Sequence, residues 1–120
     1  MPRWKTILAI AGILLAATPL TAGQICQPTL TVKDVNFSPV VNLRRYWSAT
    51  IAVDAWPCAR GTGLFALGFV RSAENAPNFE FLEPFIWHAG ETKVRVEFWA
   101  DEAVERYWLA DVAPCPCRGE

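Results

Sequence analysis

Large apolar residues recur at every second position in three stretches of the chain, residues 45–55, 64–71 and 92–99. In the first and third stretches, most of the intervening positions are polar. Side chains of a β-strand point alternately to opposite faces, so this period is typical of a strand with one buried face. The pattern predicts three strands. Their buried faces are expected to carry Ile51, Phe65, Phe69, Val94, Val96 and Phe98.

Two further stretches show interrupted versions of the same pattern. Residues 29–37 change phase near Lys33 and Asp34, which predicts a strand with a bulge or kink. Residues 79–87 contain Pro84, which has no N–H to donate to a neighbouring strand. We therefore expect the second stretch to be an edge strand or two short pieces.

The last apolar stretch, residues 106–113, is predicted as a further strand. The segment Asp101–Arg106 before it is the one predicted helix, of one or two turns. Aspartate is favoured at a helix N-cap, which places Asp101 at the start of that helix.

Six or seven short strands without a long helix indicate an all-β domain. We expect two antiparallel sheets packed face to face, a β-sandwich of the immunoglobulin or fibronectin type. A small Greek-key barrel is the alternative. The chain has 120 residues, so residues 24–120 are predicted to form a single domain.

The first 23 residues have the layout of a secretory signal peptide. Two basic residues precede the uncharged apolar run 7–17, and small residues follow it, with cleavage expected after Ala22 or Gly23. The alternative is a membrane anchor, but such a run spans only about 16 Å as a helix, against a hydrocarbon core of roughly 30 Å. The chain is therefore predicted to be exported, with no stable membrane span after cleavage.

All four cysteines lie after this segment, and an even number in a short exported chain predicts two disulfides. Cys115 and Cys117 are separated by one proline, so a bond between them would be strained. We expect each of them to bond separately to Cys26 or Cys58, with the pairing left open. A metal site at the paired cysteines is the alternative, but it needs three or four ligands, and the chain has one histidine.

The net charge of the whole chain is −1, with 11 basic and 12 acidic residues. Binding to nucleic acid or anionic lipid needs clustered positive charge. The charge balance therefore argues against both as partners.

Nucleophilic catalysis needs a base close to a serine, threonine or cysteine, and His88 is the only imidazole. It follows Trp87 where a strand is expected to end, which is typical of a turn residue. No serine lies in a Gly-x-Ser-x-Gly turn. The candidate serines are Ser38, Ser48 and Ser72.

Clustered carboxylates are the other candidate chemistry. Glu80 with Glu83, or Asp101 with Glu102 and Glu105, could act as the acid and base of a hydrolase, or hold calcium. Solvation on a strand face is the plainer interpretation. The chain has no calcium-loop motif and no glycine-rich phosphate loop followed by lysine. We predict no enzyme activity, cofactor or metal.

Aromatic residues are unusually abundant, with six Trp, two Tyr and seven Phe. Exposed Trp and Tyr on a β-sandwich are typical anchors for another protein or platforms for sugar rings. The alternative is that these rings pack over the core edges or under arginine side chains. The predicted binding residues are Tyr46, Trp56, Trp87, Arg95, Glu97 and Trp99.

Three stretches carry a resemblance to known proteins: 74–77 (ENAP), 98–108 (FWADEAVERYW) and 114–118 (PCPCR). They resemble a group of small, exported, uncharacterised bacterial proteins. The resemblance implies a periplasmic or secreted bacterial protein and carries over no catalytic residue.

The leading functional hypothesis is a non-enzymatic binding or accessory module for another extracytoplasmic protein. Its predicted surface is aromatic and acidic and surrounds Tyr46, Arg95, Glu97 and Trp99. A carbohydrate-binding module is the first alternative. A small carboxylate-dependent hydrolase is the second.

Overall fold

The computed structural model describes residues 24–119, and the predicted signal segment lies outside them. Eight strands and no helix are found in this part of the chain. Two are short, β1 (Ile25–Cys26) and β8 (Cys115–Pro116). The long strands are β2 (Thr29–Phe37), β3 (Arg44–Asp54), β4 (Thr62–Ala73), β5 (Ala76–His88), β6 (Gly90–Trp99) and β7 (Glu102–Ala110).

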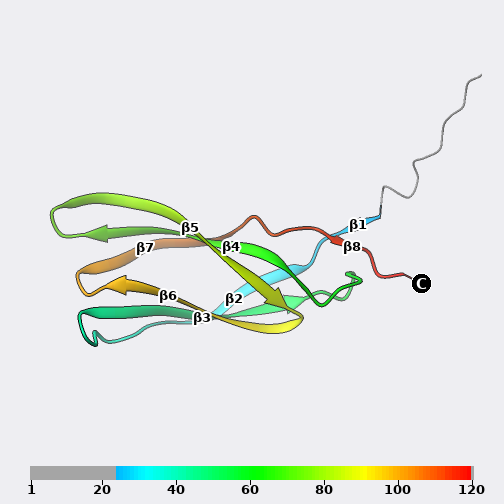
Figure 1. Cartoon of the computed structure of the whole chain (residues 1–120), viewed down its shortest axis with the longest axis horizontal. Coiled ribbons are helices and arrows are strands. Elements are labelled where there is room, and N and C mark those ends of the chain that lie inside the picture. Colours follow the sequence, from blue (N-terminus) through cyan, green and yellow to red (C-terminus); the bar gives the residue numbers. More distant parts are fainter. Residues whose placement is uncertain (1–23, 120) are drawn as a thin grey trace, which may run out of the picture.

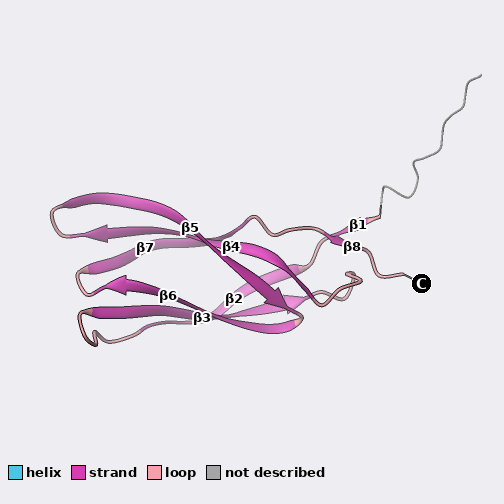
Figure 2. Ribbon diagram, in the orientation of Figure 1, coloured by secondary structure: helices cyan, strands magenta, loops and turns pink. Residues whose placement is uncertain are grey.

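The six long strands form two antiparallel sheets of three strands each, in the orders β2-β3-β6 and β5-β4-β7. Figure 1 shows the two sheets as layers, with the ribbon of β1 and β8 at one end of the molecule. Figure 2 shows that turns and loops are confined mainly to the two ends of the layers. The predicted β-sandwich is confirmed. The alternative of a closed Greek-key barrel is wrong, because the sheets keep separate edges.

The core lies between the two sheets. It contains the side chains that the alternation of apolar residues predicted to face inward. All six residues predicted to face inward are buried, and Ile51 and Phe69 have no exposed surface. Aromatic rings join the layers at the centre, where Trp47 of β3 packs edge-on against Phe69 of β4, with centroids 4.9 Å apart.

The predictions for the two interrupted strands are confirmed. The pairing of β2 with β3 shifts register between Lys33 and Asn36, and Asp34 has φ 55°, so a bulge lies where the apolar phase changes. Strand β5 lies at the edge of its sheet and pairs only with β4. It continues through Pro84 as one strand, since a proline on an edge strand need not break the ladder.

The helix predicted over Asp101–Arg106 is wrong. Strand β7 already begins at Glu102, and it ends at Ala110 rather than at residue 113. The Glu102 carboxylate accepts a hydrogen bond from the backbone N–H of Trp99 at 2.8 Å, which closes a tight turn from β6. Pairing with β4 over the length of β7 then outweighs the local preference for a helix.

Two disulfides lie near the ends of the described chain: one joins β1 to the residue after β8, and the other joins the β3–β4 loop to β8. They link Cys26 to Cys117 and Cys58 to Cys115. The prediction that Cys115 and Cys117 bond separately is confirmed, and the pairing left open is now defined. Both bonds lie at the end of the sandwich that holds β1 and β8. Two disulfides in so small a domain indicate an oxidising environment.

Removing the bond that ties the β3–β4 loop to β8 is expected to destabilise the fold strongly. The double variant Cys58→Ala and Cys115→Ala frees a loop with a sequence separation of 57 residues. Loop closure in the unfolded chain then predicts a loss of about 4 kcal/mol in the free energy of unfolding. Urea denaturation measures this, and a loss below about 1 kcal/mol would contradict the predicted role of the bond.

Candidate functional site

The structure brings four of the predicted binding residues together on the outer face of the sheet β2-β3-β6. Tyr46 of β3 lies directly opposite Glu97 of β6, and Arg95 and Trp99 lie two positions to either side of Glu97. Residues two apart on a strand share a face, so all four side chains point away from the core. The Trp99 side chain is 55% exposed.

The other two predicted residues lie elsewhere. Trp56 is exposed, but it follows the far end of β3, close to the disulfides. Trp87 is a correction, because it is completely buried in the core. It lies opposite Gly63, and a Cβ at Gly63 would stand 2.6 Å from the indole, so the missing side chain provides the space for the ring.

Arginines cover the rings that remain near the surface. The guanidinium of Arg95 lies 4.5 Å from the ring centroid of Tyr46, and that of Arg44 lies 5.4 Å from Trp99. Arg118 lies 5.2 Å from Trp56 in the same way. These are cation–π geometries, so packing under arginine side chains, the alternative considered for these rings, is found at each of them.

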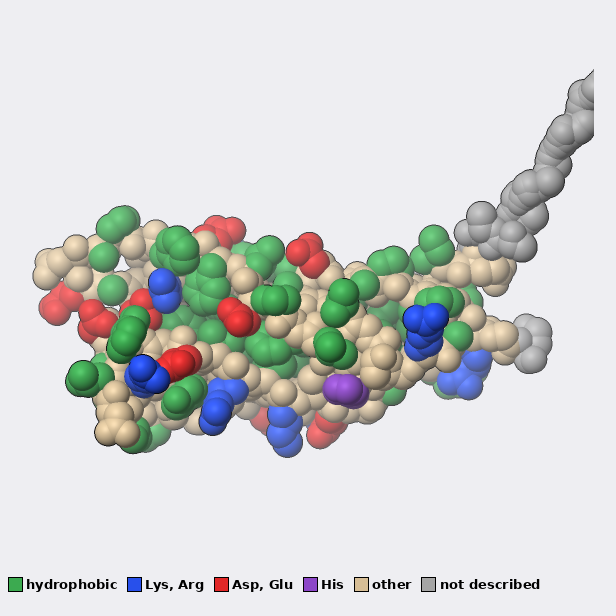
Figure 3. All heavy atoms as spheres, viewed as in Figure 1, with side chains coloured by type: hydrophobic (Ala, Val, Ile, Leu, Met, Phe, Trp, Pro, Cys, Tyr) green, Lys and Arg blue, Asp and Glu red, His purple; other side chains and the backbone are tan. Residues whose placement is uncertain are grey.

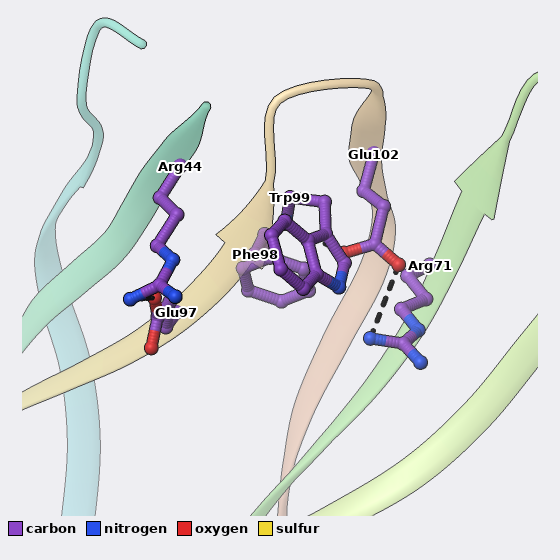
Figure 4. A pocket seen from close by; sticks show the side chains of 6 residues that line it. All are labelled: Arg44, Arg71, Glu97, Phe98, Trp99 and Glu102. Atoms are coloured by element: carbon purple, nitrogen blue, oxygen red, sulfur yellow. Dashed lines mark hydrogen bonds and ion pairs between the residues drawn. The ribbon is translucent and has the colours of Figure 1, made fainter. Parts of the chain in front are cut away.

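A small hollow opens at the end of the sandwich opposite the disulfides. Figure 4 shows its lining, with Trp99 and Phe98 between two ion pairs. Arg44 and Glu97 form one pair at 2.9 Å, with both side chains about half exposed. The hollow has a volume of about 180 Å³, enough for a few water molecules rather than a substrate.

The second ion pair of this hollow is much more enclosed. Glu102 is 8% exposed, and one carboxylate oxygen lies 3.1 Å from Arg71 while the other accepts the Trp99 N–H. Every polar atom of this carboxylate therefore has a partner, as a buried charge requires. The arrangement anchors the β6–β7 turn.

The two ion pairs provide a matched test of burial. Arg71→Met leaves the Glu102 carboxylate buried without its cation, and we expect a loss of about 3 kcal/mol in the free energy of unfolding. Arg44→Met removes the exposed pair and is expected to cost less than about 1 kcal/mol. Thermal and urea denaturation compare the two variants, and equal losses would contradict the structural role of Glu102.

A third ion pair joins Lys33 to Glu91 at 2.9 Å on the outer face of β2-β3-β6. The hydrogen bond with Glu91, and then its charge, raise the pKa of Lys33, and the same contacts with Lys33 lower the pKa of Glu91. A carboxyl group with a lowered pKa stabilises the fold at pH values above its pKa in the unfolded chain. This contribution disappears as the pH falls through the pKa that the group has in the folded chain. Both side chains are about half exposed, so the pair belongs to the solvated surface.

The candidate catalytic groups are dispersed. Glu80 and Glu83 lie an odd number of positions apart on β5 and so point to opposite faces of the sheet. Glu105 accepts a hydrogen bond from Ser72 at 2.6 Å, and the backbone N–H of His88 donates to the hydroxyl of Thr92. Within residues 24–119, no three His, Cys, Asp or Glu side chains are grouped so that they could hold a metal ion.

The described part of the chain contains no helix long and apolar enough to cross a membrane.

The outer face of the sheet β5-β4-β7 is a feature that the sequence analysis did not single out. Leu64 of β4 lies opposite Ile86 of β5, and Leu82 of β5 lies opposite Gly68 of β4. The three large side chains are each at least 50% exposed. Figure 3 shows hydrophobic side chains over the β5, β4 and β7 layer, with acidic side chains among them and Lys or Arg side chains at both ends of the molecule. We call this surface the outer apolar face; its residues are Leu64, Ala66, Gly68, Val70, Leu82, Pro84, Ile86, Trp108 and Ala110.

The side chain of Trp108 of β7 packs flat on this face. Its indole lies over Gly68, where a Cβ would stand 2.2 Å from Cε2 of the ring, so any other residue at position 68 would displace Trp108. The sequence holds one signal of the face, the run Leu64–Val70, which is apolar at every position. Continuous apolar strands are typical of sheets covered on both faces. In residues 24–119, no second layer covers the outer face of β4; Trp108 lies over Gly68 and Ala66 is buried, but Leu64 stays exposed.

Comparison with family models, with curated protein sequences and with solved structures found no match for the chain.

The two tryptophans predicted as binding residues at the ends of β5 and β6 should respond very differently to truncation. Trp87→Ala opens a cavity in the core, and we expect a loss of about 3 to 5 kcal/mol in the free energy of unfolding. Trp99→Ala removes a largely exposed ring and is expected to cost less than about 1 kcal/mol. Melting curves of the two variants check this, and a collapse of Trp99→Ala would show that its ring supports the fold.

Proposed function

We propose that this chain is a non-enzymatic module that binds another extracytoplasmic protein through its outer apolar face. The observation that carries the proposal is the exposure of Leu64, Leu82 and Ile86 as neighbours on one sheet. Scattered apolar residues are normal on a surface, and the largest contiguous apolar patch of a monomer, about 300 to 600 Å², is often functional.

The face alone is smaller than a stable interface, whether with a second copy or with another protein. Three strands at about 4.8 Å spacing and the Leu64–Val70 stretch at about 3.4 Å per residue cover roughly 14 by 24 Å. This is about 340 Å² in projection, below the roughly 800 Å² per partner of a standard stable interface. A partner that also reaches a neighbouring edge or end of the sandwich would supply the remaining area.

A carbohydrate-binding module is the weaker candidate. Sugar-binding platforms need exposed aromatic rings that lie close together. Trp56 and Trp99 lie at opposite ends of the sandwich, and each is packed against an arginine. The dispersed carboxylates likewise give a hydrolase little support.

The strand order supports an immunoglobulin-like classification within the sandwich class. The first, second and fifth long strands form one sheet, as strands A, B and E do in immunoglobulin domains. The third and sixth long strands are neighbours in the other sheet, as strands C and F are. The disulfides and the predicted signal segment support a periplasmic or secreted location.

Introducing a negative charge on the face tests the proposal. The chain with Ile86→Glu and the unchanged chain are each immobilised and exposed to an extract of the native cell envelope, and bound proteins are identified by mass spectrometry. We expect a specific partner whose retention falls at least about tenfold with Ile86→Glu, because the carboxylate must be desolvated at the interface.

The matched control is Leu43→Glu, which places the same charge on an exposed leucine in the β2–β3 loop. Retention should survive this change. A partner held equally by the Ile86→Glu variant would contradict the proposed face. Binding to a glycan array that disappears with Trp99→Ala would instead favour the carbohydrate-binding alternative.

A further inference from the structure

The two long sides of the sandwich differ. On the side of β5 and β6, Phe81 and Phe98 meet across the layers with centroids 6.1 Å apart and close the core. On the side of β2 and β7, the strands enclose a groove of about 440 Å³. Its lining is Val35, Phe37, Trp47, Val104, Glu105, Arg106 and Tyr107.

The groove reaches the core. Trp47 forms part of its wall although only 2% of this residue is exposed, and the ring of Tyr107 lies 5.0 Å from it. Toward the disulfides the same side is closed, because the side-chain amide of Gln27 donates to the carbonyl of Val112 at 3.1 Å. The opening is therefore confined to the stretch where the β2 bulge and the first half of β7 face each other.

Strand β7 borders this groove with an unpaired edge. Eight of its nine residues pair with β4 on one side, and no strand among residues 24–119 pairs with the other. In an immunoglobulin domain, the strand that corresponds to β7 has a further strand, G, beside it. Strand β5, at the other edge of the sheet, carries Pro84, which has no N–H to donate to an added strand, whereas β7 has no proline and is interrupted by one bulge, at Glu105.

An unmatched cation lies next to the groove. Arg45 precedes Trp47 by two residues on β3, and its guanidinium lies 3.7 Å from the ring centroid of Phe37. Its Nε is buried and has no hydrogen-bond partner in the described chain, unlike Arg44 and Arg71, which pair with carboxylates. A buried donor without an acceptor is costly, and a carboxylate is its strongest match.

We propose that the groove between β2 and β7 binds an extended segment of another protein, which pairs with the free edge of β7 as an added strand. Main-chain hydrogen bonds to β7 would provide affinity, and apolar side chains at alternate positions would fill the groove over Trp47 and Tyr107. An acidic residue of the same segment would pair with Arg45. This site is separate from the outer apolar face, and its test uses none of the residues of that face.

The course of the chain allows a direct test with a fused strand. Strand β7 runs toward the disulfide end, and β8 follows at that end (Figure 1). A strand appended after the last residue could therefore turn back along β7 in the antiparallel direction that every pair in this sheet uses. Ten residues separate the end of β7 from the last residue, and the linker must cover that stretch again; about 30 Gly and Ser residues have a root-mean-square span of roughly 30 Å, comparable with ten extended residues.

The probe is a nine-residue strand of alternating Val and Thr with one Asp aligned with Arg45, fused to the full chain. Hydrogen exchange of the β7 amides that do not bond to β4 is the readout. We expect these amides to exchange at least about tenfold more slowly than in the unfused chain. A control fusion with Pro at alternate positions, which cannot donate the ladder hydrogen bonds, should leave exchange unchanged.

Replacing the Asp of the fused strand by Asn tests Arg45 without altering the host fold, and protection should fall about tenfold. The difference in protection between the Asp and Asn strands should vanish in the Arg45→Met variant. It should persist in the control variant Arg60→Met, which replaces an exposed arginine of the β3–β4 loop. Equal exchange in the alternating and proline fusions overturns the proposal. The proposal is also overturned if the β7 amides of the unfused chain exchange slowly and become more protected as the protein concentration rises, because a second copy would then occupy the edge.

Discussion

The packing of aromatic rings between two three-stranded sheets is the interaction on which the rest of this structure depends. Phe69 lies at the centre, with Trp47, Phe81 and Phe98 around it at centroid distances between 4.9 and 5.7 Å. These rings come from β3, β4, β5 and β6, so one cluster holds strands from both layers. The disulfides lie at the end of the sandwich, where the buried Cys58 and Cys115 extend the core.

The same packing explains why the two sides of the sandwich differ. The rings of β5 and β6 fill one side, whereas β7 offers Tyr107 and Val104 over Trp47 and leaves a groove. The unpaired edge of β7 and the outer apolar face meet along this strand, since Trp108 belongs to the face and Tyr107 to the groove. The two proposed surfaces therefore lie on opposite faces of one strand, and a single partner could use both.

Sequence patterns predicted the interior well and the surface poorly. The period of two identified the buried faces of β3, β4 and β6 because a strand in a two-layer fold must bury one face, whatever its neighbours are. The same pattern failed at Trp87, whose place at a strand end suggested exposure, because the space for its ring is provided by Gly63 on another strand. It also failed at Asp101–Arg106, where pairing with β4 outweighed local preference.

The amino-acid sequence by itself determined that the chain is an all-β sandwich and which faces of β3, β4 and β6 are buried. It also determined where β2 bulges and that Cys115 and Cys117 bond to distant cysteines. These properties follow from local periodicity, backbone chemistry and the short spacing of two cysteines. Only the tertiary structure decided the disulfide pairing, the contacts of Tyr46, Trp56 and Trp99 with arginines, the burial of Glu102 with Arg71, and the edge position of β7. Each of these depends on which strands become neighbours, and strand order is a property of the whole packed chain.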